Sequence, residues 1–331
     1  MTTRTTVEVG GRELSLSNLD KLLYPPTGTS TGTSTGTSTG TSTGTSTGTS
    51  TGTSRGTSAG TTKAEVIEYY ARIAPTMLPH LAGRCITLKR FPDGVQKEGF
   101  FEKRCPKHRP EWMGTALGPG DRNGDVAYCR MDEAAGLVWA ANMAALELHV
   151  PMALAADLDS PRAVVFDFDP GAPAAMKECC EIAMLVHEIL GAVNLQGFAK
   201  TSGSKGLQLY VPLNTPCTHQ VAADFALAVG QLLEHQHRER VTTTMAKAVR
   251  PGKIFVDWSQ NARFKTTIGV YSLRARPEPT CSTPVTWEEV SACADGAPEL
   301  RFTWREVLAR VDELGDLFEP VLTLQQTLPG G

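Results

Sequence analysis

The stretch Val164-Val165-Phe166-Asp167-Phe168-Asp169-Pro170-Gly171 predicts a buried strand that carries two carboxylates. Residues two apart in a strand project from the same face, so Asp167 and Asp169 point together while the apolar side chains of the other face pack into the core. Two adjacent carboxylates repel each other unless a positive charge lies between them. A divalent cation with hard oxygen ligands is the partner that we expect. The alternative is a strand that simply ends in the polar turn Pro170-Gly171.

A second apolar segment, Ile254-Phe255-Val256-Asp257-Trp258, places one acid among four apolar neighbours. A carboxylate in such surroundings is costly to bury without a partner. If Asp257 faces the first pair, three acids can bind two cations that align an attacking hydroxyl with a phosphoryl group. The alternative is an ion pair of Asp257 with Arg250 or Arg263.

Between the two strands lies the segment 200–210, KTSGSKGLQLY, with glycines on both sides of Ser204-Lys205. Glycines allow backbone N–H groups and a lysine to approach a phosphate closely. The spacing is not that of a Walker A loop. Taken alone, this segment is equally consistent with a surface turn before a strand.

The remaining pattern alternates strands with helices, which indicates an α/β or α+β catalytic domain. The predicted helices are 63–78, 134–149, 174–190, 220–234 and 304–314, and the predicted strands are 83–91, 163–169, 207–213, 254–258 and 267–273.

A low-complexity tract interrupts the N-terminal part of this single domain, which we place at 1–331. Residues 27–54 are seven copies of Thr-Gly-Thr-Ser, and decayed copies continue to Thr62. The tract offers no apolar side chain that could offset the entropy of ordering. We predict a disordered loop over 27–62. The capping box Thr62-Lys63-Ala64-Glu65 then starts the first helix.

The composition is that of a globular protein: 331 residues, 41% hydrophobic, with a formal net charge of -3. Two basic segments, 84–109 and 247–276, could form two walls of one anion-binding cleft, although charged runs are commonly solvated faces. No window is apolar enough for a membrane span, and the N-terminus lacks the apolar centre of a signal peptide. We expect a cytoplasmic protein with no membrane partner.

The eight cysteines include no C-x-x-C pair, which argues against both a zinc ribbon and a disulfide framework. Cys105 and His108 have the spacing of half a metal site, but no second half completes it. Cys179 shares a helical face with apolar residues, so we predict a small buried side chain and not a reactive thiol.

Several runs together resemble the polymerase domain of the bacterial DNA ligase D family, in the archaeo-eukaryotic primase superfamily. The runs are VFDFDPG at 165–171, KTSGSKGLQLYVPL at 200–213, RPGKIFVDWSQN at 250–261, TTIGVYSLRAR at 266–276, NLDKLLYP at 18–25, LPHLAGR at 78–84, FFEKRCPKHRPEW at 100–112 and AALELHVP at 144–151. The resemblance covers about 15–320 and implies a primase-like fold with central mixed or antiparallel sheets flanked by helices.

By this resemblance, Asp167, Asp169 and Asp257 are catalytic acids that coordinate two Mn²⁺ or Mg²⁺ ions. The nucleotide-binding positions implied are Lys89, Arg90, His149, Ser202, Lys205, Gln208, Arg250, Gln260 and Arg274. Such catalysis is mostly positioning and charge neutralisation, so several cations around an acidic metal centre make chemical sense.

The resemblance also implies two DNA contacts. Phe100 and Phe101 match an aromatic pair that stacks on template bases, although core packing is the other reading of these residues. Asn18, Lys21 and Lys63 match a pocket for the 5'-phosphate at a DNA break. The two lysines lie about ten positions apart in the family, and here 63 − 21 = 42; removing eight tetrads restores 42 − 32 = 10. The repeat therefore interrupts the phosphate-binding loop.

One position departs from the family, which carries His where this chain has Gln208. Glutamine donates hydrogen bonds but carries no positive charge. We therefore predict weaker triphosphate binding and slow or strongly Mn²⁺-dependent synthesis.

The resemblance implies a stand-alone enzyme that adds dNTPs or rNTPs to a DNA 3' end and fills gaps at 5'-phosphorylated breaks in end joining. A Ku-like protein and a separate DNA ligase are the partners implied by analogy. One alternative is a catalytically weak protein that binds 5'-phosphorylated DNA ends. Another is a haloacid-dehalogenase-like phosphatase with Asp167 as its nucleophile.

Overall fold

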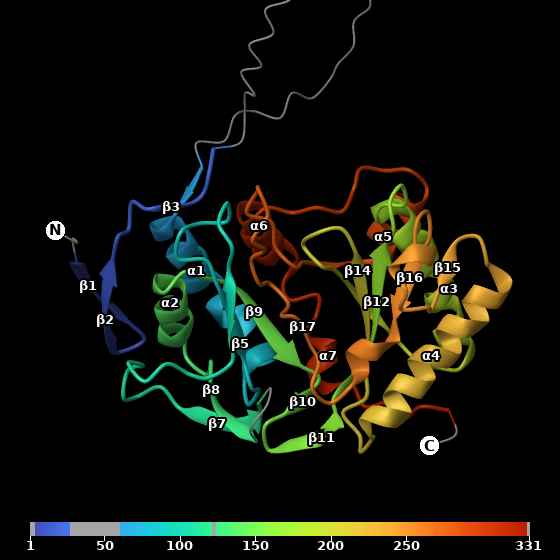
Figure 1. Ribbon diagram of the computed structural model, residues 1–331, viewed down its shortest axis with the longest axis horizontal. Helices are drawn as coiled ribbons and strands as arrows, with labels where there is room; N and C mark the ends of the chain where they lie inside the picture. The colour runs from blue at the N-terminus through green and yellow to red at the C-terminus, as the bar shows by residue number, and fades with distance from the viewer. Residues whose placement is uncertain (1–3, 27–59, 121–123, 330–331) are drawn as a thin grey trace, which may run out of the picture.

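The computed structural model describes residues 4–26, 60–120 and 124–329. Two larger β-sheets form the centre of this part of the chain (Figure 1). One has six strands and the other has four. Four two-stranded ribbons surround them: β1 (Arg4–Val9) with β2 (Arg12–Ser17), β3 (Leu22–Tyr24) with β4 (Thr61–Thr62), β7 (Thr115–Pro119) with β8 (Asp125–Cys129), and β10 (Ala153–Leu154) with β11 (Asp157–Pro161). No helix in the described ranges is both long enough and apolar enough to span a membrane.

The six-stranded sheet has β12 near its centre and is antiparallel except for one edge pair. Its order is β15 (Val241–Thr242), β16 (Ile254–Asp257), β12 (Ala163–Pro170), β14 (Leu207–Pro212), β13 (Phe198–Thr201) and β18 (Pro284–Val285), with β15 and β16 parallel. Helices α3 (Met176–Ala192), α4 (His219–Gln236) and α5 (Trp287–Ala294) form one apolar core with this sheet. Val164, Phe166 and Phe168 belong to that core, as alternation along the strand predicts.

The four-stranded sheet is antiparallel throughout, in the order β17 (Thr266–Ile268), β9 (Ala145–Pro151), β5 (Thr87–Arg90) and β6 (Phe100–Glu102). It shares a second core with α1 (Lys63–Leu81), α2 (Ala134–Asn142), α6 (Trp304–Leu314) and α7 (Pro320–Thr323). Val165 and Tyr210 belong to this second core. Strands β12 and β14 are therefore buried on both faces, between the two cores.

The strongest local predictions are confirmed. Thr62 caps α1, and its capping box with Glu65 is complete, so the helix begins at Lys63. The helix predicted at 304–314 is α6, and the strand predicted at 163–169 is β12, which extends one residue further. Cys179 is fully buried in the helical core. The predicted loop over 27–62 lies outside the described residues up to 59, while Thr61–Thr62 pair with β3 as β4.

The prediction of one helix over 134–149 is wrong. Helix α2 ends at Asn142, and residues 145–151 form β9. Ala144 adopts a left-handed conformation with φ 57°, which turns the chain, and its carbonyl accepts a hydrogen bond from the Phe91 amide. Strand β9 is buried on both faces, and a continuous apolar run of this kind has no period that separates strand from helix.

Two other predictions need correction. The strand predicted at 267–273 ends at Ile268, because the chain turns at Tyr271, which has φ 64°. Cys105 and Cys129 form a disulfide, although the cysteine pattern argued against one. Strand β8 brings the two together, since the Cys105 amide donates to the Ala127 carbonyl, and no sequence spacing reveals such a contact. The Cys105–His108 pair is therefore no half metal site.

Candidate functional site

The acidic residues of β12 and β16 meet on one side of the six-stranded sheet. Asp167 lies directly opposite Asp257 in the antiparallel register, and Asp169 follows Asp167 by two residues. Cross-strand partners and residues two apart share a face of the sheet. The three backbone positions therefore present their side chains on the face that is not covered by α3 and α4.

Burial and mutual repulsion make this cluster electrostatically unfavourable by itself. Burial raises the pKa of Asp167 to about 7, and the charges of Asp169 and Asp257 act in the same direction, whereas a hydrogen bond from Gln208 opposes them. The pKa of Asp169 is also raised, by burial and then by the charge of Asp257. A cation placed beside these carboxylates would relieve both causes.

Asp257 is turned partly away from the other two acids. Its Oδ1 accepts hydrogen bonds from the Ser259 amide and hydroxyl, and its Oδ2 accepts one from Gln260 Nε2 at 3.0 Å. It thereby caps the short 3₁₀ helix η2 (Trp258–Asn261). Within the described ranges, no three His, Cys, Asp or Glu side chains are clustered closely enough to hold a metal ion. Asp167 and Asp169 fit a divalent cation by their chemistry, because hard, buried carboxylate oxygens are its preferred ligands, and Asp257 would join after rotating from η2.

A pocket of about 380 Å³ lies against these acids, between the two sheets. Strands β12 and β14 supply one wall, and β9 and β17 supply another. The charged and polar side chains that line it are His149, Asp167, Asp169, Ser202, Ser204, Lys205, Gln208, Arg250, Thr266, Thr267, Arg274 and Arg276. Carboxylates at one end and several cations around them suit an anionic ligand that carries a divalent cation.

The loop 202–206 is compact for two steric reasons. Gly203 has φ 65°, and a Cβ there would lie 2.6 Å from the Cys281 backbone. A Cβ on Gly206 would lie 2.3 Å from the Phe168 carbonyl oxygen. The Ser202 hydroxyl accepts hydrogen bonds from the Ser204 and Gly206 amides at 3.3 and 3.2 Å. The glycines therefore let the loop pack against β12 and leave Lys205 at the pocket.

Gln208 lies on β14 directly opposite Asp167 and is 3% exposed. Its Oε1 accepts a hydrogen bond from Lys200 Nζ at 2.5 Å, and Lys200 also donates to the Ile268 carbonyl and to Ser282 Oγ. Because Lys200 only donates when charged, it fixes the orientation of the Gln208 amide with the NH₂ group away from itself. That NH₂ group is the one that meets Asp167.

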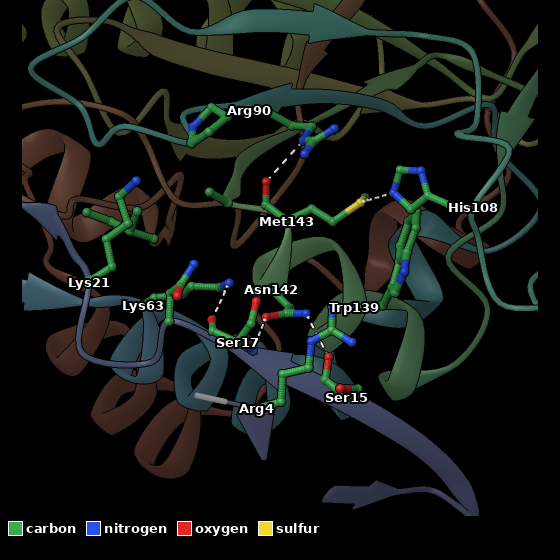
Figure 2. Close-up of a pocket in the computed structure, with 14 residues that line it drawn as sticks. Arg4, Ser15, Ser17, Lys21, Lys63, Arg90, His108, Trp139, Asn142 and Met143 are labelled. Carbon is green, nitrogen blue, oxygen red and sulfur yellow. Dashed lines mark hydrogen bonds between the residues drawn. The ribbon is translucent and has the colours of Figure 1, made fainter. Parts of the chain in front are cut away.

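A second, larger pocket of about 510 Å³ lies near the N-terminus of α1, and Figure 2 shows its lining side chains. It contains Asn18, Lys21 and Lys63, the three residues that the sequence assigned to a phosphate pocket, and its other basic lining residues are Arg4, Arg90 and His108. None of the described lining residues is acidic. A pocket of this charge is suited to a phosphate group.

Lys63 is the first residue of α1 and is only 5% exposed. Its Nζ donates to the Ser17 carbonyl at 2.6 Å, while Lys21 Nζ lies 3.1 Å from Asp93 Oδ1. Burial, and then the charge of Lys21, lower the pKa of Lys63 to about 8. The Lys63 amide also donates to the Lys21 carbonyl at 2.8 Å, so the backbone joins the two lysines across the interrupting repeat.

Comparison with known proteins agrees with this arrangement. A family model described as the LigD primase-polymerase domain matches residues 62–318. The chain belongs to the LigD primase-polymerase family. The LigD protein of Mycolicibacterium smegmatis, described as a multifunctional non-homologous end joining protein, is 46% identical over 92% of this chain and 36% of its own length. The corresponding protein of Mycobacterium tuberculosis is 39% identical over 93% of this chain and 37% of its own length.

A solved structure extends the family match to three dimensions. The polymerase domain from Mycobacterium tuberculosis Ligase D, in complex with DNA, superposes with a TM-score of 0.77 at 38% identity, covering 95% of this chain and 99% of that chain. The primase-like α+β fold is therefore established. The chain spans just over a third of the length of the curated relatives named above.

The structure places four family-implied residues away from the lining of the acidic pocket. Gln260 and Asp257 form the hydrogen bond described above, next to the pocket. Lys89 lies 3.8 Å from Glu147 and is not among the lining residues. Arg90, the next residue, instead lines the second pocket and pairs with Glu102 at 3.0 Å.

Phe100 and Phe101 lie on the edge strand β6 and are 46% and 58% exposed. Core packing is therefore excluded for both rings. Lys89 Nζ lies 5.1 Å from the centre of the Phe101 ring, and the ring meets His149 edge-on at 5.3 Å. This face of the four-stranded sheet thus joins an exposed aromatic ring to His149, which lines the pocket beside the acids.

Sequence reasoning missed two residues that organise the site, Lys200 and Glu147. Both are charged residues within quoted family runs, and both are almost fully buried, at 1% and 2% exposure. A charged residue among apolar neighbours, as in 145–150, was the available signal, because buried charges need partners. Arg276, two residues after Arg274, was also missed and lines the pocket.

Proposed function

We propose that the chain is a DNA-dependent nucleotidyltransferase that adds dNTPs or rNTPs to a DNA 3' end and fills gaps at 5'-phosphorylated breaks. The observation that carries this proposal is the register of β12 and β16, which brings Asp167, Asp169 and Asp257 to one face beside a cation-lined pocket. The family match supports the same chemistry. The comparisons give no support to the phosphatase alternative.

In this proposal the three acids hold two Mn²⁺ or Mg²⁺ ions, which would activate the 3'-hydroxyl and neutralise charge on the triphosphate. Lys205, Arg250 and Arg274 line the same pocket and would bind the phosphates. Ser202 holds the loop that presents Lys205. His149 and Gln208 would orient the nucleotide beside the acids.

The basic pocket at the start of α1 would hold the 5'-phosphate on the far side of the gap. Two adjacent residues of β5 connect the sites, because Lys89 faces Glu147 while Arg90 lines the basic pocket. Strand β5 would therefore lie between the site for the 5'-phosphate and the site for the 3' end of a short gap. An exposed Phe101 would stack on a template base.

We place the enzyme in the cytoplasm, in end joining, with a Ku-like protein and a DNA ligase as partners. The relatives named for non-homologous end joining support this pathway. The solved relative's complex with DNA supports DNA as the substrate.

The decisive experiment is primer extension on a gapped duplex with a 5'-phosphate, with dNTPs and rNTPs, and with Mn²⁺ compared with Mg²⁺. We expect extension by one or a few nucleotides, and less on the same duplex with a 5'-hydroxyl. Asp169→Asn is the matched inactive control because it keeps the side-chain shape and removes the charge.

A different outcome would favour the end-binding alternative. If the protein binds the 5'-phosphorylated gap but no nucleotide is added under any metal condition, the polymerase proposal fails. Gln208 gives that alternative its structural basis, because an uncharged amide stands at the acids where the family carries His.

A further inference from the structure

Glu147 occupies the middle of the four-stranded sheet, on the face that borders the nucleotide pocket. It is opposite Lys89 of β5 and two residues before His149 on β9. Phe101 of β6 is opposite Lys89 on the other side. These four side chains therefore share one face across three strands.

Two cations and one histidine converge on this one carboxylate; burial lowers the pKa of His149, so its ring is a neutral partner at pH 7. Glu147 Oε2 lies 2.9 Å from His149 Nε2 and 3.8 Å from Lys89 Nζ, and Oε1 lies 3.3 Å from Arg274 Nε. The Ala275 amide donates to Oε1 at 3.0 Å, which fixes the chain next to Arg274. Each of the three partners belongs to the set that the family resemblance assigns to the nucleotide.

The carboxylate is charged in spite of its burial. Burial alone would raise the pKa of Glu147, but the His149 hydrogen bond and the charges of Arg274 and His149 outweigh it and lower the pKa to about 2. Arg274 meets Glu147 through Nε at 3.3 Å as an ion pair, because this buried Nε has no hydrogen-bond partner among the described residues. Arg274 also lines the pocket, so the residue that Glu147 pairs with borders the space where an anion would bind.

We propose that Glu147 is a positioning residue that holds His149 and Arg274, which line the pocket, in the geometry needed to receive the nucleotide, with Lys89 as its third partner. It does not line the pocket, so it acts through its partners and not by contact with the ligand. Without its charge, Lys89 and Arg274 lose their shared counter-charge, and His149 loses the carboxylate that its ring nitrogen contacts. The proposal rests on the proposed function, because it assumes that this pocket binds a nucleoside triphosphate.

A purely structural ion cluster is the competing explanation, and the two differ in what they affect. A structural role lowers stability and weakens every binding event together. A positioning role weakens nucleotide binding selectively and leaves the basic pocket of Lys21 and Lys63 intact. Binding of a 5'-phosphorylated duplex is therefore an internal measure of correct folding.

The test compares wild type with Glu147→Gln and Glu147→Asp, using the whole chain. Equilibrium binding of ATP and dATP with Mn²⁺ is measured by calorimetry, binding of a 5'-phosphorylated gapped duplex by fluorescence anisotropy, and primer extension by its KM and kcat. Glu133→Gln is the matched control, because Glu133 pairs with Arg12 at 2.9 Å and neither residue lines a pocket described above.

We expect Glu147→Gln to weaken nucleotide binding at least about tenfold, with KM raised more than kcat is lowered. Glu147→Asp keeps the charge but shortens the reach, so it should fall between wild type and Glu147→Gln. Duplex binding should stay within about twofold for both variants, and Glu133→Gln should match wild type in both assays.

Other results would overturn the assignment. A folded Glu147→Gln that binds ATP as tightly as wild type excludes a positioning role, and joint loss of nucleotide and duplex binding by both variants assigns Glu147 to folding. Failure of wild type to bind nucleotide at all would contradict the proposed function itself, so the two failures are distinguishable.

Discussion

Gln208 is a single residue whose surroundings bear on the proposed nucleotide site. Its carbonyl is occupied by Lys200, and its NH₂ group supports Asp167. We predict that Gln208→His strengthens triphosphate binding roughly three- to tenfold, because a protonated imidazole carries the positive charge that an amide lacks, although both of its nitrogens then donate and the hydrogen bond from Lys200 is lost. Calorimetric titration and extension rates in Mg²⁺ and Mn²⁺ would check this. Unchanged affinity and rate would mean that this position does not limit the enzyme.

Lys63 is a second single residue with a predicted effect, because its protonation makes both fold stability and phosphate affinity depend on pH. Its pKa in the fold is about 8, below the usual lysine value, so it loses charge as pH rises through 8 while the unfolded chain still binds the proton. By linkage, its contribution to fold stability rises between about pH 8 and pH 10.5, whereas its attraction for phosphate falls. We predict that affinity for a 5'-phosphorylated duplex falls between pH 7 and pH 9, measured by anisotropy.

Lys63→Arg is the control for that titration, because arginine stays charged throughout this range. The affinity of Lys63→Arg for the 5'-phosphorylated duplex should not fall between pH 7 and pH 9. The affinity of wild type for a 5'-hydroxyl duplex should change little over the same range. A fall of equal size with the 5'-hydroxyl duplex would place the titration elsewhere.

The elements show why some of the fold could be predicted and some could not. Helix α1 and strand β12 were accessible because a capping box and a strict alternation are local signals. Strand β9 could not be predicted, because a strand buried on both faces does not alternate apolar with polar residues. The Cys105–Cys129 disulfide joins residues 24 positions apart and depends on how β8 packs, which local sequence patterns do not reveal.

The cap of α1 supports both the helix and the pocket beside it. Thr62 accepts a hydrogen bond from the Glu65 amide, and the next residue is Lys63. We predict that Thr62→Ala lowers the free energy of unfolding by about 1 kcal/mol and weakens 5'-phosphate binding. Thr286→Ala is the matched control, because Thr286 caps α5 in the same way. It should show a similar stability loss by urea unfolding with unaltered duplex binding.

The β3–β4 ribbon predicts the effect of removing the repeat. Leu22 and Tyr24 pair with Thr62 and Thr61, and this pairing is independent of the length that separates them. We predict that deleting residues 27–58 preserves 5'-phosphate binding within about twofold and raises stability by roughly 1–2 kcal/mol, because a shorter closure costs less entropy. Urea unfolding and anisotropy of the deletion variant check this. Lost duplex binding would show that the tract contributes to the pocket.

At the scale of the molecule, the site depends on two sheets that the sequence could not orient. The acids were found from alternation within β12 and β16, since each strand carries its own pattern. Their meeting depends on the register of the two strands. Glu147 escaped notice because its partners come from β5, β9 and the segment after β17, and only the assembled sheets bring them together.

The ionised acids should lower the stability of the whole molecule in the absence of a cation and bind a cation when one is present. Burial and the neighbouring acids raise the pKa of Asp167 to about 7, so ionising it above that pH costs folding free energy. A raised carboxylate pKa means that stability is highest when Asp167 is protonated and declines as pH rises from about 4 through 7. Asp167→Asn should therefore stabilise the metal-free protein at pH 8, by roughly 1–3 kcal/mol, and much less at pH 5.

Adding Mn²⁺ should make wild type more stable than Asp167→Asn at pH 8. A ligand that binds only the folded state at about 100 times its Kd stabilises it by about 2.7 kcal/mol, and wild type should gain this while Asp167→Asn gains little. Thermal unfolding of both proteins at pH 8, with EDTA and then with Mn²⁺, shows which protein is the more stable under each condition. Magnesium should act in the same direction, whereas NaCl at equal ionic strength should not. If Mn²⁺ stabilises both proteins equally, the ion binds elsewhere, and Asp167 and its neighbouring acids are not the metal site.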